Sequence, residues 1–190
     1  MMDEMEFVRR LKKAGLERDE ERRLYAAALL NEALKEQGSK VTVVGGSIVA
    51  LFTAGHYTTA DLDFVAKNRT AVKKVLTSLG FTEVSSIRYV HETLGLIVEY
   101  MGENPLAERI DTIKIKDLEV DAISIEDVLV SKLEMLERGV DTEKSERQVK
   151  IIAYLLGSKI DEEYLMKRLV NKNLWELWTR IKAEVDNYGP

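Results

Sequence analysis

Apolar residues recur at helical spacing in the first part of the chain. Phe7 and Leu11 are four residues apart, as are Leu30 and Leu34, so each pair lies on one helical face. Gly15 interrupts the pattern and Gly38 follows it. We therefore expect two helices between residues 3 and 36.

The middle of the chain alternates between short apolar runs, typical of strands, and amphipathic stretches, typical of helices. The predicted strands lie at residues 41–44, 61–65, two or three within 81–100, 110–115 and 118–122, and the predicted helices at 47–54 and 69–79. Gly45-Gly46 allows a tight turn between the first strand and the first of these helices. This part predicts a mixed sheet flanked by helices.

From Ser124 onward the pattern is helical. Ser124 to Asp127 forms a capping box that opens one helix, and Ser158 to Asp161 is a candidate for a second. The last helix carries Trp175 and Trp178 on one face, which predicts a core or interface position. We expect an α+β (mixed α/β) protein with N-terminal helices at 1–37, an α/β core at 38–122 and a helical region at 123–190 that packs on this core.

Composition narrows the function classes. The 190-residue chain has no cysteine and only two histidines, so thiolate and histidine-rich metal sites are excluded. Its formal net charge of -5 argues against broad binding to nucleic acid, although a local basic patch could hold a phosphate. Charged residues make up 32%, against about 25% in ordinary domains, a bias that resembles proteins of thermophiles. We expect His56 and His91 at the surface.

We also expect a cytoplasmic protein without a membrane segment. No apolar run approaches the roughly 18–20 residues that cross a bilayer. The segment that opens the sequence lacks the basic and apolar stretches of a secretory signal.

Two aspartates in the predicted strand 61–65 suggest a metal site. Successive side chains of a strand point to opposite faces, so Asp61 and Asp63 share one face while Leu62 and Phe64 turn to the core. Two unpaired carboxylates at this distance repel each other. A divalent cation removes that cost, because Mg²⁺ or Mn²⁺ prefers oxygen ligands.

The turn before the predicted helix 47–54 suggests a phosphate site. Gly45, Gly46 and Ser47 offer backbone N–H groups near the positive end of a helix dipole, and glycine lets a phosphate come close to the backbone. Alone, a Gly-Gly pair is more often a tight turn and Asp-x-Asp a solvated strand end. The functional interpretation depends on both motifs occurring together.

In this combination the chain resembles the nucleotidyltransferase superfamily, which has a DNA polymerase beta-like fold. The match consists of Gly45-Gly46-Ser47 followed by Asp61-Leu62-Asp63-Phe64. Thr59, the segment 79–81 and the segment 124–133 are similar to the small prokaryotic branch that includes toxin-type nucleotidyltransferases. The resemblance covers about residues 38–156.

The resemblance implies transfer of a nucleoside monophosphate from an NTP, such as ATP, to an acceptor hydroxyl, with release of pyrophosphate. The acceptor could be an RNA end, a protein or a small molecule, and a toxin-antitoxin partner is a further possibility. Metal ions would be held by Asp61, Asp63 and a third carboxylate, for which Glu99 is the first choice and Asp121 the alternative.

The resemblance also implies roles in nucleotide binding for further residues. Lys132 would be catalytic together with the three carboxylates Asp61, Asp63 and Glu99, through contact with the nucleotide phosphates. Thr59 would join the glycine turn in nucleotide binding. Two positions depart from the pattern, because Tyr57 stands where relatives often have arginine and Ser145 near where they often have aspartate. The alternative function is therefore a catalytically degenerate nucleotide-binding protein or an antitoxin-like regulatory partner.

Overall fold

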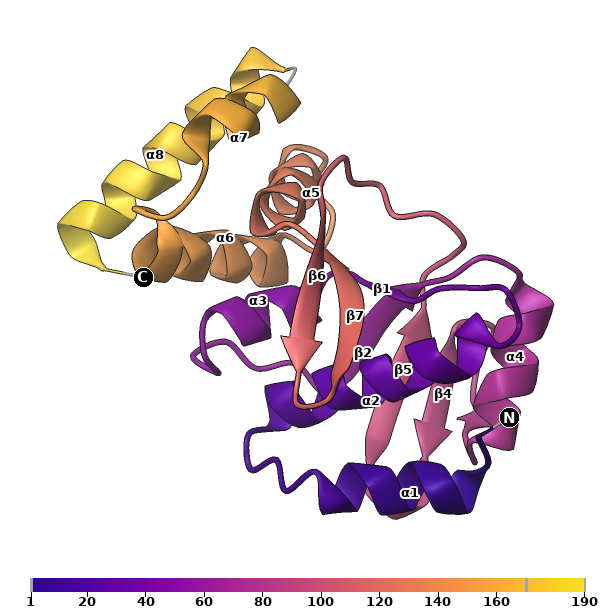
Figure 1. Cartoon of the computed structure of the whole chain (residues 1–190). Helices are drawn as coiled ribbons and strands as arrows, with labels where there is room; N and C mark the ends of the chain where they lie inside the picture. Colours follow the sequence, from indigo (N-terminus) through magenta and orange to yellow (C-terminus); the bar gives the residue numbers. More distant parts are fainter. Residues whose placement is uncertain (1, 170, 190) are drawn as a thin grey trace.

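The protein, described here from a computed structural model, is defined over residues 2–169 and 171–189. Figure 1 shows a twisted sheet crossed by the N-terminal helices, with the C-terminal helices grouped beside it. The predicted fold class, a mixed α/β core followed by helices, is confirmed.

The two predicted N-terminal helices are α1 (Glu4–Lys13) and α2 (Asp19–Lys35). The Asp3 carboxylate caps α1 by accepting a hydrogen bond from the N–H of Glu6. Helix α2 lies across the sheet (Figure 1), and its middle is buried on almost every side. This helix is therefore part of the core rather than a surface helix.

Within the described residues, seven strands form one mixed sheet in the order β3-β4-β5-β2-β1-β7-β6. Their bounds are β1 (Thr42–Val43), β2 (Asp61–Val65), β3 (Thr82–Glu83), β4 (Arg88–His91), β5 (Leu96–Tyr100), β6 (Ile110–Ile115) and β7 (Leu118–Ile123). Strand β2 pairs parallel with β5 and antiparallel with β1. The strand that carries the paired aspartates is thus the central one.

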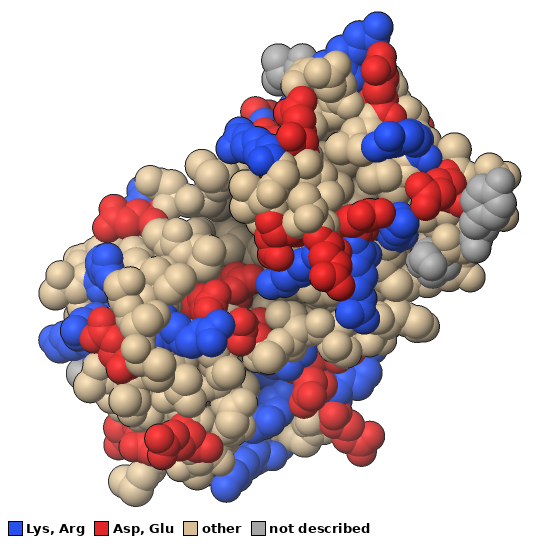
Figure 2. Space-filling model, turned by 180° about the vertical axis from the view of Figure 1, so that it is seen from behind, with Lys and Arg blue, Asp and Glu red and all other residues tan. Residues whose placement is uncertain are grey.

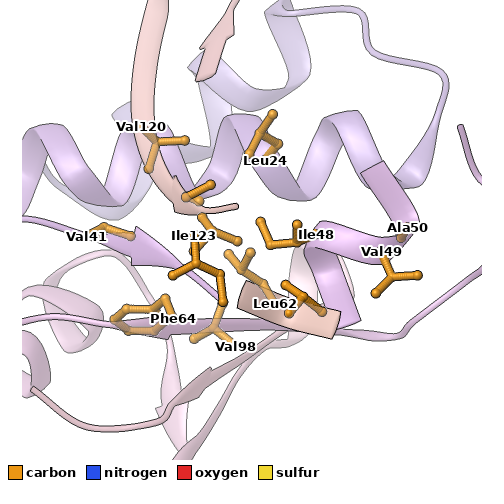
Figure 3. Close-up of a cluster of buried hydrophobic side chains, with 14 of the residues drawn as sticks. Leu24, Val41, Ile48, Val49, Ala50, Leu62, Phe64, Val98, Val120 and Ile123 are labelled. Atoms are coloured by element: carbon orange, nitrogen blue, oxygen red, sulfur yellow. The ribbon is translucent and has the colours of Figure 1, made fainter. Parts of the chain in front are cut away.

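The core fills one face of this sheet. Helices α3 (Gly46–Phe52) and α4 (Arg69–Ser78) connect the strands, with the short 3₁₀ helix η1 (Glu92–Leu94) before β5. Figure 3 shows Leu62 and Phe64 of β2 among apolar side chains of the neighbouring elements. Both are buried, as the alternation along the strand predicts.

The described part of the chain ends in four helices: α5 (Ile125–Glu137), α6 (Thr142–Leu156), α7 (Glu162–Arg168) and α8 (Lys172–Tyr188). Ser124 caps α5 by accepting a hydrogen bond from the N–H of Asp127, which is one half of the predicted capping box. The other half is not formed, because the Ser124 N–H donates to the Arg109 carbonyl. The predicted capping box at Ser158 is wrong, because Asp161 caps α7 instead. The N–H groups of Lys159 and Ile160 bond back to Leu156, so residue 158 still belongs to the turn that ends α6.

A buried ionic cluster joins α5 to α7 and to the segment before β6. Asp127 accepts hydrogen bonds from the Arg109 N–H (3.0 Å), the Ser124 hydroxyl (3.2 Å), the Tyr164 hydroxyl (2.8 Å) and the Arg168 guanidinium (2.7 Å). Burial alone would raise the pKa of Asp127, but these donors lower it. We call these five residues the Asp127 cluster.

Two aromatic predictions had different outcomes. Trp178 is fully buried, as predicted for a core position. The prediction that His91 lies at the surface is wrong: its ring packs against Phe7 and Phe81, with centroids 6.0 and 5.2 Å away. Burial lowers the pKa of His91, which keeps the ring neutral.

Within residues 2–169 and 171–189, none of the helices combines the length and apolar character needed to cross a membrane.

Candidate active site

Three carboxylates gather on the face of the sheet opposite the core. Asp61 and Asp63 share this face because they are two residues apart on β2. Glu99 of β5 stands beside Asp63 in the parallel register, so its side chain points the same way. We call Asp61, Asp63 and Glu99 the acidic face.

An arginine completes the acidic face. Arg88 of β4 is paired with Glu99 in the antiparallel register. Its Nε donates to Glu99 Oε1 at 2.7 Å, and its Nη2 lies 3.3 Å from Asp61 Oδ2. One guanidinium therefore bridges two of the three carboxylates. Sequence reasoning missed Arg88, since only the pairing of β4 with β5 brings it to this place.

Asp63 is a carboxylate of the acidic face whose pKa is perturbed. Burial raises its pKa to about 6, and the charges of Glu99 and Asp61 add to this rise. A hydrogen bond from the Gly46 N–H to Asp63 Oδ2, at 3.2 Å, and the charge of Lys144 act in the opposite direction. A carboxyl group with this pKa changes charge close to neutral pH.

The glycine turn holds the acidic strand. Gly45 has φ +67° and ψ -144°, a conformation essentially restricted to glycine, and a Cβ there would collide with the Asp63 carboxylate. The Ser47 hydroxyl donates to the Asp61 carbonyl at 2.9 Å. Thr59 lies next to Gly46, with its hydroxyl 3.7 Å from where a Gly46 Cβ would stand. All four predicted nucleotide-binding residues therefore lie beside Asp61 and Asp63.

Two lysines face the acidic face from the C-terminal helices. Lys132 of α5 is buried, and burial, followed by the charge of Lys144 on α6, lowers its pKa, while Asp63 raises it. Among the described residues, its Nζ has the sulfur of Met135, at 3.8 Å, as its one neighbour for hydrogen bonding. Figure 2 shows acidic surface in the hollow between the core and the C-terminal helices, with basic surface beside it. Sequence reasoning found Lys132 but missed Lys144.

The two departures from the family pattern are both buried. The Tyr57 hydroxyl accepts a hydrogen bond from Gln148 Nε2 at 2.8 Å, and the Arg147 guanidinium lies 6.0 Å from the Tyr57 ring. Ser145 lies against the sulfur of Met135, at 3.9 Å. Tyr57 thus links its segment to α6 through the hydrogen bond with Gln148. Arg147 of α6 places a cation near the Tyr57 ring.

Asp121, the alternative third carboxylate, lies elsewhere. It is on β7, which is separated from β2 by β1. Lys40 Nζ is 2.5 Å from one of its oxygens, and the Thr112 hydroxyl donates to the other at 3.0 Å. Both oxygens of Asp121 are thus bound within the protein, whereas Glu99 stands next to Asp63.

The acidic face has the chemistry that a divalent cation requires. Carboxylate oxygens are the ligands that Mg²⁺ and Mn²⁺ prefer, and the raised pKa of Asp63 reflects a burial and repulsion that a cation would relieve. Among the residues that the structure describes, no group of three or more His, Cys, Asp or Glu side chains is spaced to hold a metal ion. Arg88 fills the place between Asp61 and Glu99, so a metal shared by all three carboxylates requires this guanidinium to move.

The fold is similar to that of solved structures of nucleotidyltransferase-like proteins. An antigenic nucleotidyltransferase-like protein from Paracoccidioides brasiliensis aligns over 69% of this chain and 75% of its own, with 18% identity and a TM-score of 0.53. The chain has a nucleotidyltransferase fold. This confirms the fold that the resemblance at Gly45-Gly46-Ser47 and Asp61-Leu62-Asp63 implies.

More distant similarity is found to the antibiotic-resistance factor ANT(2'')-Ia. Its solution structure aligns over 98% of this chain and 100% of its own, with 12% identity and a TM-score of 0.49. A crystal structure of ANT(2'')-Ia in complex with adenylyl-2''-tobramycin covers 82% of this chain and 94% of its own, with 14% identity and a TM-score of 0.45. No protein-family model and no curated protein sequence matches the chain.

Proposed function

We propose that this protein is a metal-dependent nucleotidyltransferase that transfers a nucleoside monophosphate from an NTP, such as ATP, to an acceptor hydroxyl. The observation that carries the proposal is the acidic face, in which three carboxylates from two strands meet beside the glycine turn. The nucleotidyltransferase fold supports the same reaction class. The acceptor oxygen forms a bond to the α-phosphorus, the bond to pyrophosphate breaks, and the hydroxyl proton leaves.

Each group of residues has a part in this reaction. Lys132 and Lys144 lie where they would attract the triphosphate, because both act electrostatically on the same site. Gly46 and Ser47 hydrogen-bond to β2, and together with Gly45 and Thr59 they would position the nucleotide beside it. A carboxylate of the acidic face is placed to accept the proton of the hydroxyl.

Asp61, Asp63 and Glu99 would hold Mg²⁺ or Mn²⁺. When bound, such ions lower the pKa of the attacking hydroxyl and neutralise charge on the leaving pyrophosphate. In their absence, Arg88 offsets part of the repulsion within the acidic face.

Nucleotidyl transfer can be tested with labelled NTPs. The protein is incubated with each NTP, Mg²⁺ or Mn²⁺, and three acceptor classes: RNA, the protein itself and small molecules with hydroxyl groups. We expect label in one class and release of pyrophosphate. Asp63→Asn should abolish both, whereas Asp111→Asn, an exposed aspartate on β6, should leave both unchanged.

The proposal fails if no acceptor class gains label and if wild type and Asp63→Asn respond identically to NTP with Mg²⁺ in thermal unfolding. Label transfer that persists at the wild-type rate in Asp63→Asn would also overturn it, because the acidic face would then be irrelevant to the reaction.

A second function is favoured by Arg88. Its ion pairs with Asp61 and Glu99 occupy the place that a shared metal would take, so the chain could bind nucleotide without transferring it. Such a degenerate protein could act as an antitoxin-like regulatory partner. It predicts NTP binding without pyrophosphate release, or a stable complex with the product of a neighbouring gene.

A further inference from the structure

A pocket that the acidic face does not explain lies at the start of the central strands. It has a volume of about 510 Å³ and is lined by the first turns of α2, by residues 58–60 before β2 and by residues 94–97 at the start of β5. Ala60 directly precedes Asp61, and Ile97 is the β5 partner of Asp61 in the register. The pocket therefore lies at the end of β2 that carries Asp61.

Two arginines of α2 line this pocket. The guanidinium of Arg22 donates to the Leu94 carbonyl at 2.6 Å, which holds it in place at the start of β5. Arg23 has no hydrogen-bond or ion-pair partner among the residues that the structure describes, and its Nε is buried. Asp19 also lines the pocket, so the lining has a formal net charge of +1. A buried N–H without a partner is costly unless a ligand accepts its hydrogen bond.

The chemistry of this pair fits an oxyanion. Arginine binds phosphate through two parallel N–H groups, and a guanidinium fixed beforehand loses little freedom when it does so. Lys132 and Lys144 act on Asp63 from the C-terminal helices, whereas Arg22 and Arg23 line a pocket where β2 and β5 begin, on the side of α2. The two pairs of cations can therefore serve two different substrates.

We propose that the Arg22/Arg23 pocket binds a phosphate group of the acceptor. The inference depends on the proposed nucleotidyl transfer, because it assigns the triphosphate to the lysine side and the acceptor to the arginine side. It narrows the acceptor to a phosphate-bearing molecule, either a polynucleotide or a small phosphorylated compound.

Calorimetric titration tests the pocket without the reaction. Inorganic phosphate, a nucleoside 3′-monophosphate and a short single-stranded RNA are titrated into metal-free protein at one ionic strength. We expect at least one probe to bind and its Kd to rise at least tenfold in the Arg22→Gln/Arg23→Gln double variant. Arg23→Lys keeps the positive charge but lacks the two parallel N–H groups of the guanidinium, so its Kd should rise by less than in the double variant.

A matched control removes the same charge elsewhere. Arg9 and Arg180 are exposed on α1 and α8, so Arg9→Gln/Arg180→Gln should leave the Kd unchanged. Equal weakening in both double variants would show general charge attraction and overturn the proposal, as would absence of binding by all three probes. Thermal unfolding confirms that each variant is folded. RNA binding much tighter than that of the small probes identifies a polynucleotide acceptor, and the reverse identifies a small phosphorylated one.

The test also separates this inference from the proposed function. Binding of ATP with Mn²⁺ should depend on Lys132 and Lys144 and not on the arginines. If the arginine double variant loses ATP binding, the pocket belongs to the nucleotide and the inference is wrong. If phosphate binding behaves as expected but no NTP is ever consumed, the proposed transfer fails while the pocket remains.

Discussion

The acidic face and the Asp127 cluster are both built from charged residues brought together by the fold, yet their charges are balanced in opposite ways. In the Asp127 cluster, one fully buried carboxylate receives four hydrogen bonds, and its pKa is lowered. On the acidic face, Asp63 receives one hydrogen bond from the residues that the structure describes, donated by the Gly46 N–H, and its pKa is raised to about 6.

The contrast separates a structural group from a functional one. A buried carboxylate surrounded by donors stabilises the native state and has no capacity left for a ligand. A partly buried carboxylate beside two others is held in an unfavourable environment, which a cation can relieve. The candidate site is therefore distinguished by burial and charge repulsion that the protein itself does not compensate, rather than by the number of charges.

Removing the central carboxylate of the Asp127 cluster should have the largest effect on stability. Asp127→Ala leaves the Arg168 guanidinium facing a vacated site, so we expect the free energy of unfolding to fall by about 3–5 kcal/mol. Urea unfolding measures this change. Glu163→Ala is the control, because Glu163 pairs with Lys167 on the open surface and should cost less than about 0.5 kcal/mol. Equal losses in the two variants would refute the contrast.

The contributions of Asp63 and Asp127 to stability should change with pH in opposite directions. Because the native pKa of Asp63 is about 6 and its ordinary value is 3.8, the native state holds this proton more tightly than the unfolded state. The contribution of Asp63 to the free energy of unfolding is fully present below about pH 3.8 and is lost as pH rises through about 6. The loss amounts to about 2–3 kcal/mol. Asp127 behaves oppositely, since its lowered pKa adds stability that is lost on acidification.

Urea unfolding between pH 4 and pH 7, in the presence of a chelator, measures this effect as the difference between wild type and Asp63→Asn. The variant should gain stability relative to wild type as pH rises. A difference that does not vary with pH would contradict the assignment of the raised pKa to Asp63.

Gly45→Ala should damage the acidic face and leave the Asp127 cluster intact. The added methyl group meets the Asp63 carboxylate in a conformation that only glycine adopts easily, so we expect a loss of about 1–3 kcal/mol and loss of nucleotidyl transfer. Gly38→Ala is a matched control, because Gly38 has a similar φ of +70° with nothing within 4 Å of a Cβ. Its variant should lose some stability and keep its activity.

Arg88→Gln should produce the smallest effect, a gain in metal affinity. Without the guanidinium, Asp61 and Glu99 are free to bind a cation, and we expect Mn²⁺ to bind up to about tenfold more tightly, or about 1.4 kcal/mol. Calorimetry with Mn²⁺ measures the change. Lys73→Gln, which removes a cation from an exposed pair with Glu83, should leave the affinity unaltered. Weaker Mn²⁺ binding in Arg88→Gln would show that Arg88 supports the metal site instead of competing with it.

Local geometry was accessible from the sequence. The two N-terminal helices, the buried alternation of Leu62 and Phe64, and the Ser124 cap depend on residues a few positions apart, whose spacing determines which face they share. The common face of Asp61 and Asp63 belongs to the same class, because it follows from the two-residue period of a strand. The local pattern gave a wrong prediction at Ser158, because this residue belongs to the turn that ends α6 and does not cap α7.

Only the tertiary structure decided which distant residues join that face. Glu99 stands next to Asp63 because β5 pairs with β2 in one register, and Arg88 arrives through a further pairing of β4 with β5. Lys144 faces Asp63 because α6 packs against α3, the helix next to β2, and Arg22 and Arg23 reach the same strands from α2. Strand register and helix docking depend on packing across the whole chain, and no local spacing in the sequence encodes them.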